Sequence, residues 1–168
     1  MKKEERKKRL KELLNLQKQK EMLNNRLQEE KIVREAFEET FGNELEYEIL
    51  SSDETELIIK DFTDNFPIAF WNRINWAEKS VNQLAINEVE INSIPFILNR
   101  KGFDTSSSIY IFWGTGNFPG VRTTLTSGLL QKYDEILWVG SDMYYYCPVQ
   151  KYIIEFFHDD SINIGWVP

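Results

Sequence analysis

The stretch EILWVGSDMYYYCPVQKYIIEFFHDDSINIGWV, residues 135–167, decides the fold. Its apolar segments are rich in aromatic and β-branched residues, as β-strands are. They are separated by SD, PVQ and DDS, which are short polar connections typical of tight turns. Consecutive strands joined by such short turns run antiparallel. The stretch therefore predicts an antiparallel meander with strands at residues 135–140, 143–147, 151–158 and 162–167.

Further strands are predicted upstream of this meander. LEYEIL (45–50) and TELIIK (55–60) flank the polar SSDE, a pattern that indicates a hairpin. FPIAFWNRINW (66–76) is aromatic and is predicted to begin in an extended conformation. Residues 109–113 and 121–124 are β-branched or aromatic and are predicted as strands. Together these segments predict a sheet of about six strands, within the usual size range.

A long N-terminal helix is predicted over residues 2–41, because that segment contains no Gly or Pro before Gly42. Val33, Phe37 and Phe41 form an apolar i, i+4 stripe, so we expect its C-terminal half to pack on the domain. Short helices are predicted at IPFILNRKGF, with Ser93 as its cap and Gly102 as its stop, and at residues 125–132. The fold class is thus α+β: an antiparallel meander with helices packed on one face, preceded by the long helix.

Charge divides the chain into two parts. Residues 1–31 carry eleven Lys or Arg and six Asp or Glu, a net charge of +5. Residues 32–168 carry nine Lys or Arg and twenty-one Asp or Glu, a net charge of -12. We therefore expect a charged helical extension over residues 1–31 and a single acidic domain over 32–168. The extension has an imperfect heptad pattern, which leaves open a weak surface helix or self-association.

The acidic domain indicates the class of partner. Such a field repels nucleic acid and attracts a basic protein, although excess acid can also serve solubility alone. No 7–15-residue apolar run follows the basic N-terminus, so no signal peptide is expected. No apolar run is long enough for a membrane helix. A single cysteine, Cys147, suits a reducing compartment, and we expect a cytoplasmic protein that binds neither nucleic acid nor membrane.

The glycine-rich GTGNFPG, residues 114–120, resembles part of a dinucleotide-binding loop. That fingerprint needs a third glycine where this chain has Pro119, and it needs a helix where VRTT is extended. The phosphate-binding G-K-[ST] motif is missing as well. The segment is therefore predicted to connect a β-hairpin, and no cofactor is expected.

Catalytic and metal-binding residues are sparse in the sequence. His158 is the only histidine and follows a hydrophobic strand, where a structural or contact role is more common than catalysis. One His and one Cys supply no familiar metal-ligand set, so no metal is expected. The chain is therefore predicted not to be an enzyme. The alternative is a small hydrolase or ligand-binding enzyme that uses His158 and nearby carboxylates.

Three series of residues resemble a known family. They are IYIFWGTGNFPGVRTTL, YDEILWVGSDMYYYC and YIIEFFHDDSINIG, and the likeness extends over residues 66–168. They resemble immunity proteins of bacterial contact-dependent growth inhibition and related polymorphic toxin systems. The departures are Gly120 between Pro119 and Val121, and Asp159–Ser161 where a glycine turn is usual.

The resemblance implies a cytoplasmic antitoxin. It would bind the C-terminal domain of a cognate toxin, many of which are nucleases, and cover its active site. An acidic surface suits a groove that binds phosphates, and charge would speed capture. Binding should need carboxylates beside exposed aromatic anchors. Because side chains alternate between the two faces of a strand, at least one of the tyrosines 144–146 should face solvent or a partner. The predicted partner-binding residues are Asp134, Glu135, Asp142, Tyr144, Tyr146, His158, Asp159 and Asp160.

Overall fold

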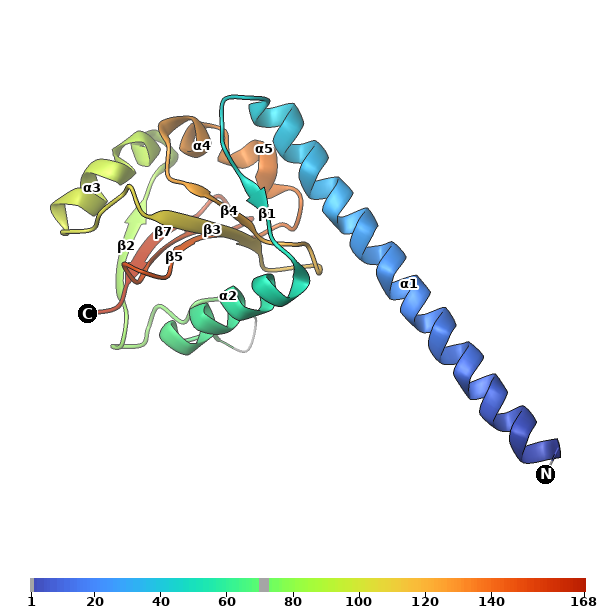
Figure 1. The fold of residues 1–168 in the computed structure, drawn as a ribbon. Helices are drawn as coiled ribbons and strands as arrows, with labels where there is room; N and C mark the ends of the chain where they lie inside the picture. Colours follow the sequence, from blue (N-terminus) through green and yellow to red (C-terminus); the bar gives the residue numbers. More distant parts are fainter. Residues whose placement is uncertain (1, 70–72) are drawn as a thin grey trace.

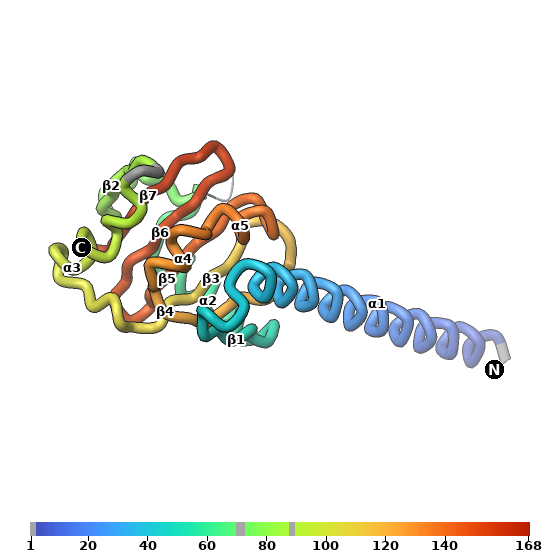
Figure 2. The backbone as a smooth tube through the Cα atoms, turned by 90° about the horizontal axis from the view of Figure 1, so that it is seen from above, coloured from blue at the N-terminus to red at the C-terminus, as the bar shows by residue number. Residues whose placement is uncertain are grey.

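The computed structural model describes residues 2–69 and 73–168. Figure 1 shows a sheet with helices on both faces and one long helix, α1 (Lys2–Phe41), that projects away from it. Figure 2 shows from above that only the C-terminal end of α1 lies on the domain. The predicted helix bounds are confirmed, because α1 ends at Phe41 and Gly42 follows with a left-handed φ of 52°.

The sheet has seven strands in the order β1-β4-β3-β5-β6-β7-β2, and all its pairings are antiparallel. The meander consists of β5, β6 and β7, in which consecutive strands are direct neighbours. The strands are β1 (Glu48–Ile49), β2 (Asn82–Ile86), β3 (Ser108–Trp113), β4 (Val121–Thr124), β5 (Met143–Cys147), β6 (Tyr152–Phe156) and β7 (Ile162–Trp166).

The helices cover the two faces of the sheet unequally (Figure 1). The end of α1, α3 (Ile94–Arg100), α4 (Ser127–Gln131) and α5 (Tyr133–Leu137) pack on one face, and a short 3-10 helix, η1 (Glu88–Ser93), precedes α3. Helix α2 (Ser52–Asn65) packs on the other. The α+β class, the antiparallel sheet and the long first helix are confirmed. The cover differs from the prediction in α2, which lies on the opposite face from the other helices.

The predicted hairpin at residues 45–60 is wrong in its second half. Residues 55–60 belong to α2, which begins with a capping box. The Ser51 hydroxyl accepts a hydrogen bond from Glu54 N at 3.2 Å, and the Glu54 carboxylate accepts one from Ser51 N at 2.9 Å. This pairing satisfies backbone N–H groups at the helix start, so SSDE initiates a helix instead of a turn.

The predicted strand at residues 135–140 is also wrong. Its first part lies in α5, and the turn that follows leads into β5. Ile136 and Val139 are buried while Trp138 is exposed, which is the spacing of a helical turn. A short apolar run does not distinguish helix from strand by periodicity alone.

Two further differences concern the middle of the chain. Strand β2 and η1 occupy residues for which the pattern predicted no element. Because η1 leads directly into α3, Ser93 has helical angles and its side chain makes no capping hydrogen bond, contrary to prediction. The stop at Gly102 is confirmed by its φ of 89°. Of the segment 66–76, Phe66 is extended as predicted, whereas residues 70–72 lie outside the described residues.

The glycine-rich segment 114–120 connects β3 to β4, as predicted. Gly116 has a φ of 79° within this connection. The following strand, β4, pairs with β3 in place of forming the helix that a dinucleotide-binding loop requires.

Alternate residues of the central strands supply two separate hydrophobic clusters. Tyr145 and Ile154 belong to the larger cluster, under α1, α3, α4 and α5. Tyr144, Tyr146 and Ile153 belong to the smaller cluster, under α2. All three tyrosines are buried, so the expectation that one of them faces solvent is wrong. Helix α2, of which residues 55–60 were predicted as a strand, covers two of them.

Candidate partner-binding surface

Asp142 and His158 meet beyond the paired ends of β5 and β6. The register pairs Met143 with Phe156, so the residues on either side of this pair diverge into the adjoining loops. The Asp142 carboxylate accepts hydrogen bonds from His158 Nδ1 at 2.8 Å and from His158 N at 3.1 Å. The imidazole itself is mostly exposed. Asp142 therefore holds the start of the β6–β7 loop and orients the histidine toward solvent.

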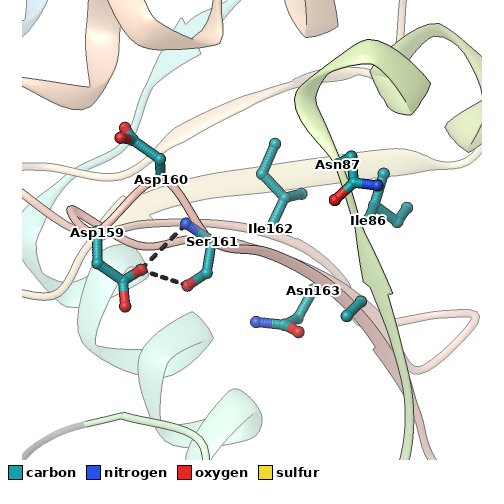
Figure 3. A pocket seen from close by; sticks show the side chains of 8 residues that line it. Ile86, Asn87, Asp159, Asp160, Ser161, Ile162 and Asn163 are labelled. Carbon is teal, nitrogen blue, oxygen red and sulfur yellow. Dashed lines mark hydrogen bonds between the residues drawn. The ribbon is translucent and has the colours of Figure 1, made fainter.

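Asp159, Asp160 and Ser161 form the turn between β6 and β7 (Figure 3). Asp159 Oδ1 accepts hydrogen bonds from Ser161 N at 3.0 Å and from the Ser161 hydroxyl at 2.5 Å. The hydroxyl bond is the main reason why the pKa of Asp159 lies below its usual value. Asp160 has a φ of 66°, a left-handed conformation that aspartate tolerates better than most residues. At this turn, where the resemblance leads one to expect glycine, the chain has two aspartates.

A buried carboxylate lies beside this loop. Glu155 of β6 is fully buried, and its Oε1 accepts hydrogen bonds from Arg73 Nε at 3.1 Å, Trp76 Nε1 at 3.0 Å and Asn163 Nδ2 at 3.2 Å. Its Oε2 has no hydrogen-bond partner in the described part of the chain. Burial raises the pKa of Glu155, although the three donors oppose that shift. Gly165 makes room for the Trp76 ring, because a Cβ at that position would lie 2.5 Å from it.

Arg73 connects the buried carboxylate to the loop. Its guanidinium donates to the Ser161 hydroxyl at 3.0 Å and lies 4.0 Å from Asp159 Oδ2. It also stacks 3.9 Å above the Phe157 ring. The loop conformation is therefore fixed from beneath by an ionic network, and part of its negative charge is already compensated by Arg73.

A shallow, open depression lies between this loop and β2 (Figure 3). Its lining combines backbone and short side chains of the β2 end with the loop residues; it consists of Ala85, Ile86, Asn87, Asp159, Asp160, Ser161, Ile162 and Asn163. Its shape suits a flat contact with a macromolecule better than the enclosure of a small ligand.

Asp134 and Glu135 lie in a different setting, the exposed first turn of α5. Glu135 lines a second shallow depression together with Glu39, Thr40 and Ala36 of α1 and with Trp138. The Trp138 side chain is 61% exposed. This α1–α5 surface, defined by Glu39, Asp134, Glu135 and Trp138, combines carboxylates with an exposed aromatic side chain. Of the predicted residues, the structure thus brings Asp142 and His158–Asp160 together and leaves Asp134 and Glu135 on a separate element.

Tyr144 and Tyr146 do not lie on the surface. They are 3% and 0% exposed and pack against α2, so their prediction as partner-contacting side chains is wrong for this conformation. The Tyr146 hydroxyl donates to Asp61 at 2.5 Å, and Lys151 pairs with the same carboxylate at 3.1 Å. Burial and this hydrogen bond raise the pKa of Tyr146 well above its usual value. Tyr146 therefore ties α2 to the sheet.

Sequence reasoning missed Glu39, Arg73, Trp138 and Glu155. Glu155 carried a signal, because it is a charged residue inside the apolar strand segment YIIEF. Trp138 was missed because residues 135–140 were predicted as a strand of the sheet. Arg73 carried no signal, because its partners lie more than eighty positions away.

The two surfaces present carboxylates, one imidazole and one exposed indole ring. Within residues 2–69 and 73–168, no three His, Cys, Asp or Glu side chains gather in a way that could hold a metal ion. Cys147 is buried, and burial raises the pKa of its thiol. Asp142 and His158 form a carboxylate–imidazole pair, but a hydrolase would also need a nucleophile at the second ring nitrogen.

Comparison with protein families tests the resemblance found in the sequence. A family model described as CdiI immunity protein EcoliA0-like matches residues 34–165. The chain belongs to this family. No curated protein matches the chain.

Membership confirms the resemblance and settles the general role. The chain is an immunity protein, whose role is to bind and neutralise a cognate toxin protein. Such a role suggests binding and not catalysis. In the described part of the structure no helix is long and apolar enough to cross a membrane. The matched region begins within α1, so most of the projecting helix lies outside it.

Proposed function

We propose that this immunity protein neutralises a toxin with a basic substrate groove, such as a nuclease, by covering its active site with an acidic surface. The net charge of -12 on residues 32–168 supports this choice of target, because a groove that binds phosphates attracts carboxylates. Neutralisation takes place in the cytoplasm, where a nuclease meets its substrate.

The α1–α5 surface is the better-supported contact region. The observation that carries this choice is the exposed Trp138, which lines one depression together with Glu39 and Glu135. Tryptophan is among the residues that contribute most to protein–protein binding, because it buries a large area at low entropic cost. Carboxylates around it would steer a basic partner and fix its orientation.

The β6–β7 loop surface, defined by Asp142, His158, Asp159 and Asp160, is the second contact region. It carries three carboxylates, as the α1–α5 surface does, but Arg73 compensates part of their charge and stacks on Phe157. It also lacks the exposed tryptophan of the α1–α5 surface. We therefore rank it second.

Binding kinetics of the cognate toxin domain at two salt concentrations test this ranking. Trp138→Ala should mainly speed dissociation, with an affinity loss above about 2 kcal/mol if it is a hot spot. Glu135→Lys should slow association and flatten its salt dependence. The matched comparison is the triple reversal of Asp142, Asp159 and Asp160 to Lys on the loop surface.

The outcomes separate the two surfaces. If only the loop variant loses binding and fails to protect cells, the loop is the interface and the α1–α5 choice is wrong. If none of the variants alters binding, the toxin contacts another face. Circular dichroism of each variant shows whether the fold is retained.

Neutralisation requires no catalysis by this chain. His158→Gln keeps a polar side chain at the loop and removes the proton-transfer group of the alternative hydrolase. We expect this variant to protect cells as the parent does, or to change only toxin affinity. Loss of protection with unchanged folding and unchanged toxin affinity would instead support the enzyme hypothesis.

A further inference from the structure

The exposed part of α1 carries a narrow apolar seam that has no partner within the described chain. Residues 3–28 are exposed throughout and extend about 40 Å at 1.5 Å per residue. A helix without tertiary contacts is only marginally stable in water, since most helical stability in proteins comes from packing. Four leucines that are each more than half exposed share one seam, namely Leu13, Leu16, Leu23 and Leu27.

These leucines occupy the a and d positions of a heptad pattern. With Leu13 at a, the positions alternate as Leu16 at d, Lys20 at a, Leu23 at d and Leu27 at a. Extended outward, the seam contains Arg6 and Arg9 before Leu13 and Glu30 after Leu27. Apart from Lys20, the seam is therefore apolar in the middle, and it is oppositely charged at its two ends.

Charge decides between the two ways in which two copies could pair. In a parallel pair, equal positions face each other, so Lys20 would meet Lys20, Glu30 would meet Glu30 and Arg6 would meet Arg6 in the seam. Arg9 would likewise meet Arg9, and each of these four like-charged contacts is destabilising and would oppose the few leucine layers.

An antiparallel pair places each a position against a d position of the other copy. Centred on residue 18, it pairs Leu13 with Leu23, Lys20 with Leu16 and Arg9 with Leu27. It also places Arg6 opposite Glu30, whose carboxylate accepts a hydrogen bond from Arg34 of the same helix at 2.8 Å. Beside the seam, Glu12 lies near Arg26, and one like-charged pair, Lys3 with Lys31, falls at the outer end. The overlap uses the whole exposed length of both helices and ends where Val33 is buried in each domain.

We propose that α1 forms an antiparallel two-stranded coiled coil with a second copy of this chain. The dimer carries one immunity domain at each end, so two toxin-binding surfaces are held apart. Lys20 in the seam weakens the pairing but fixes its alignment, as polar residues at such positions do. The dimer forms from this chain alone, so its test is independent of toxin binding.

Sedimentation velocity of the full chain across a wide concentration range tests the dimer. We expect the mass to rise with concentration from the 20.0 kDa monomer to twice that value. Leu13→Lys should raise the dissociation constant at least about tenfold. Leu14→Lys is the matched control, because Leu14 is similarly exposed but lies outside the seam, and it should leave the constant unchanged. Equal effects of the two variants, or a monomer at every concentration, would overturn the proposal.

Disulfide formation tests the orientation. A mixture of Arg6→Cys and Glu30→Cys chains should give the cross-linked heterodimer, whereas each variant alone should not cross-link. Parallel helices would give the reverse result and overturn the antiparallel arrangement. The parent chain controls for Cys147, which is buried. A chain that stays monomeric alone and pairs α1 only with added toxin domain would also overturn the proposal.

Discussion

The two faces of the sheet use alternate residues of the same strands, yet they bury different chemistry. Under α1, α3, α4 and α5 the strands contribute a continuous apolar cluster that includes Tyr145 and Ile154. Under α2 the cluster is smaller, and Glu155 and the Tyr146–Asp61 pair lie beside it. Neighbouring residues in one strand thus meet an apolar environment on one side and an ionic one on the other.

The two faces contribute to different properties of the domain, one to its stability and the other to the conformation of the β6–β7 loop. Apolar burial is non-directional and scales with area, so the larger cluster supplies most of the stability. Hydrogen-bonded charges are directional, so the smaller face fixes where Arg73, and with it the β6–β7 loop, is held. The following substitutions compare the two faces.

The largest effect is expected on the apolar face. Phe37 is fully buried and contacts the rings of Phe41, Tyr47 and Trp113. Phe37→Ala should lower the free energy of unfolding by about 3–5 kcal/mol, from lost burial and a cavity. Urea unfolding measures this. Leu57→Ala, at an exposed position of α2, should change the same quantity by less than about 0.5 kcal/mol; similar losses in both variants would contradict this view of the core.

The ionic face under α2 should make the free energy of unfolding depend on pH. The pKa of Glu155 is raised by burial, so the folded state binds its proton more tightly than the unfolded state. The parent should therefore lose stability through this group as pH rises from about 4.3 toward the raised pKa, by up to ~1.4 kcal/mol per pH unit. Glu155→Gln cannot ionise and should lack that loss. Over that pH range, the free energy of unfolding of the variant should therefore rise relative to that of the parent.

Leu57→Ala, at an exposed position of α2, provides the control for this measurement because it changes no ionisable group. Its difference from the parent should barely change with pH. If Glu155→Gln behaves in the same way, the buried carboxylate does not titrate as its surroundings imply.

A smaller effect should distinguish two adjacent tyrosines. Tyr146→Phe removes the hydroxyl that donates to Asp61 and should cost about 1 kcal/mol, because Asp61 is partly exposed. Tyr145→Phe, on the apolar face, removes a buried hydroxyl that has no partner in the described structure, and it should be neutral or stabilising. Thermal and urea unfolding of both variants check this, and the opposite order of stabilities would show that the two faces are misassigned.

The smallest effect is expected from the projecting helix. Deleting residues 2–20 removes only exposed side chains, so the apolar face stays covered by Val33, Phe37 and Phe41. The free energy of unfolding, measured where the chain is monomeric, should change by less than about 0.5 kcal/mol. A large loss at that concentration would show that the segment docks on the domain.

Local signals in the sequence were sufficient to predict where several elements begin or end. Gly42 and Gly102 end their helices because a left-handed φ favours glycine, and the sequence places them there. The capping box of Ser51 and Glu54 was also readable, and taking SSDE for a turn was an error of interpretation. The candidate site was harder to predict from the sequence, because its residues come from distant positions in the chain.

The β5–β7 meander, the long first helix and the acidic character of the domain were predictable from the sequence, because alternation, turn residues and charge are local properties. The tertiary structure alone decided that α2 buries Tyr144 and Tyr146, that Arg73 reaches Glu155 and that Trp138 lies beside Glu39. Each of these depends on which element packs on which face. That choice is made by the summed burial of the whole sheet, which no single stretch of sequence contains.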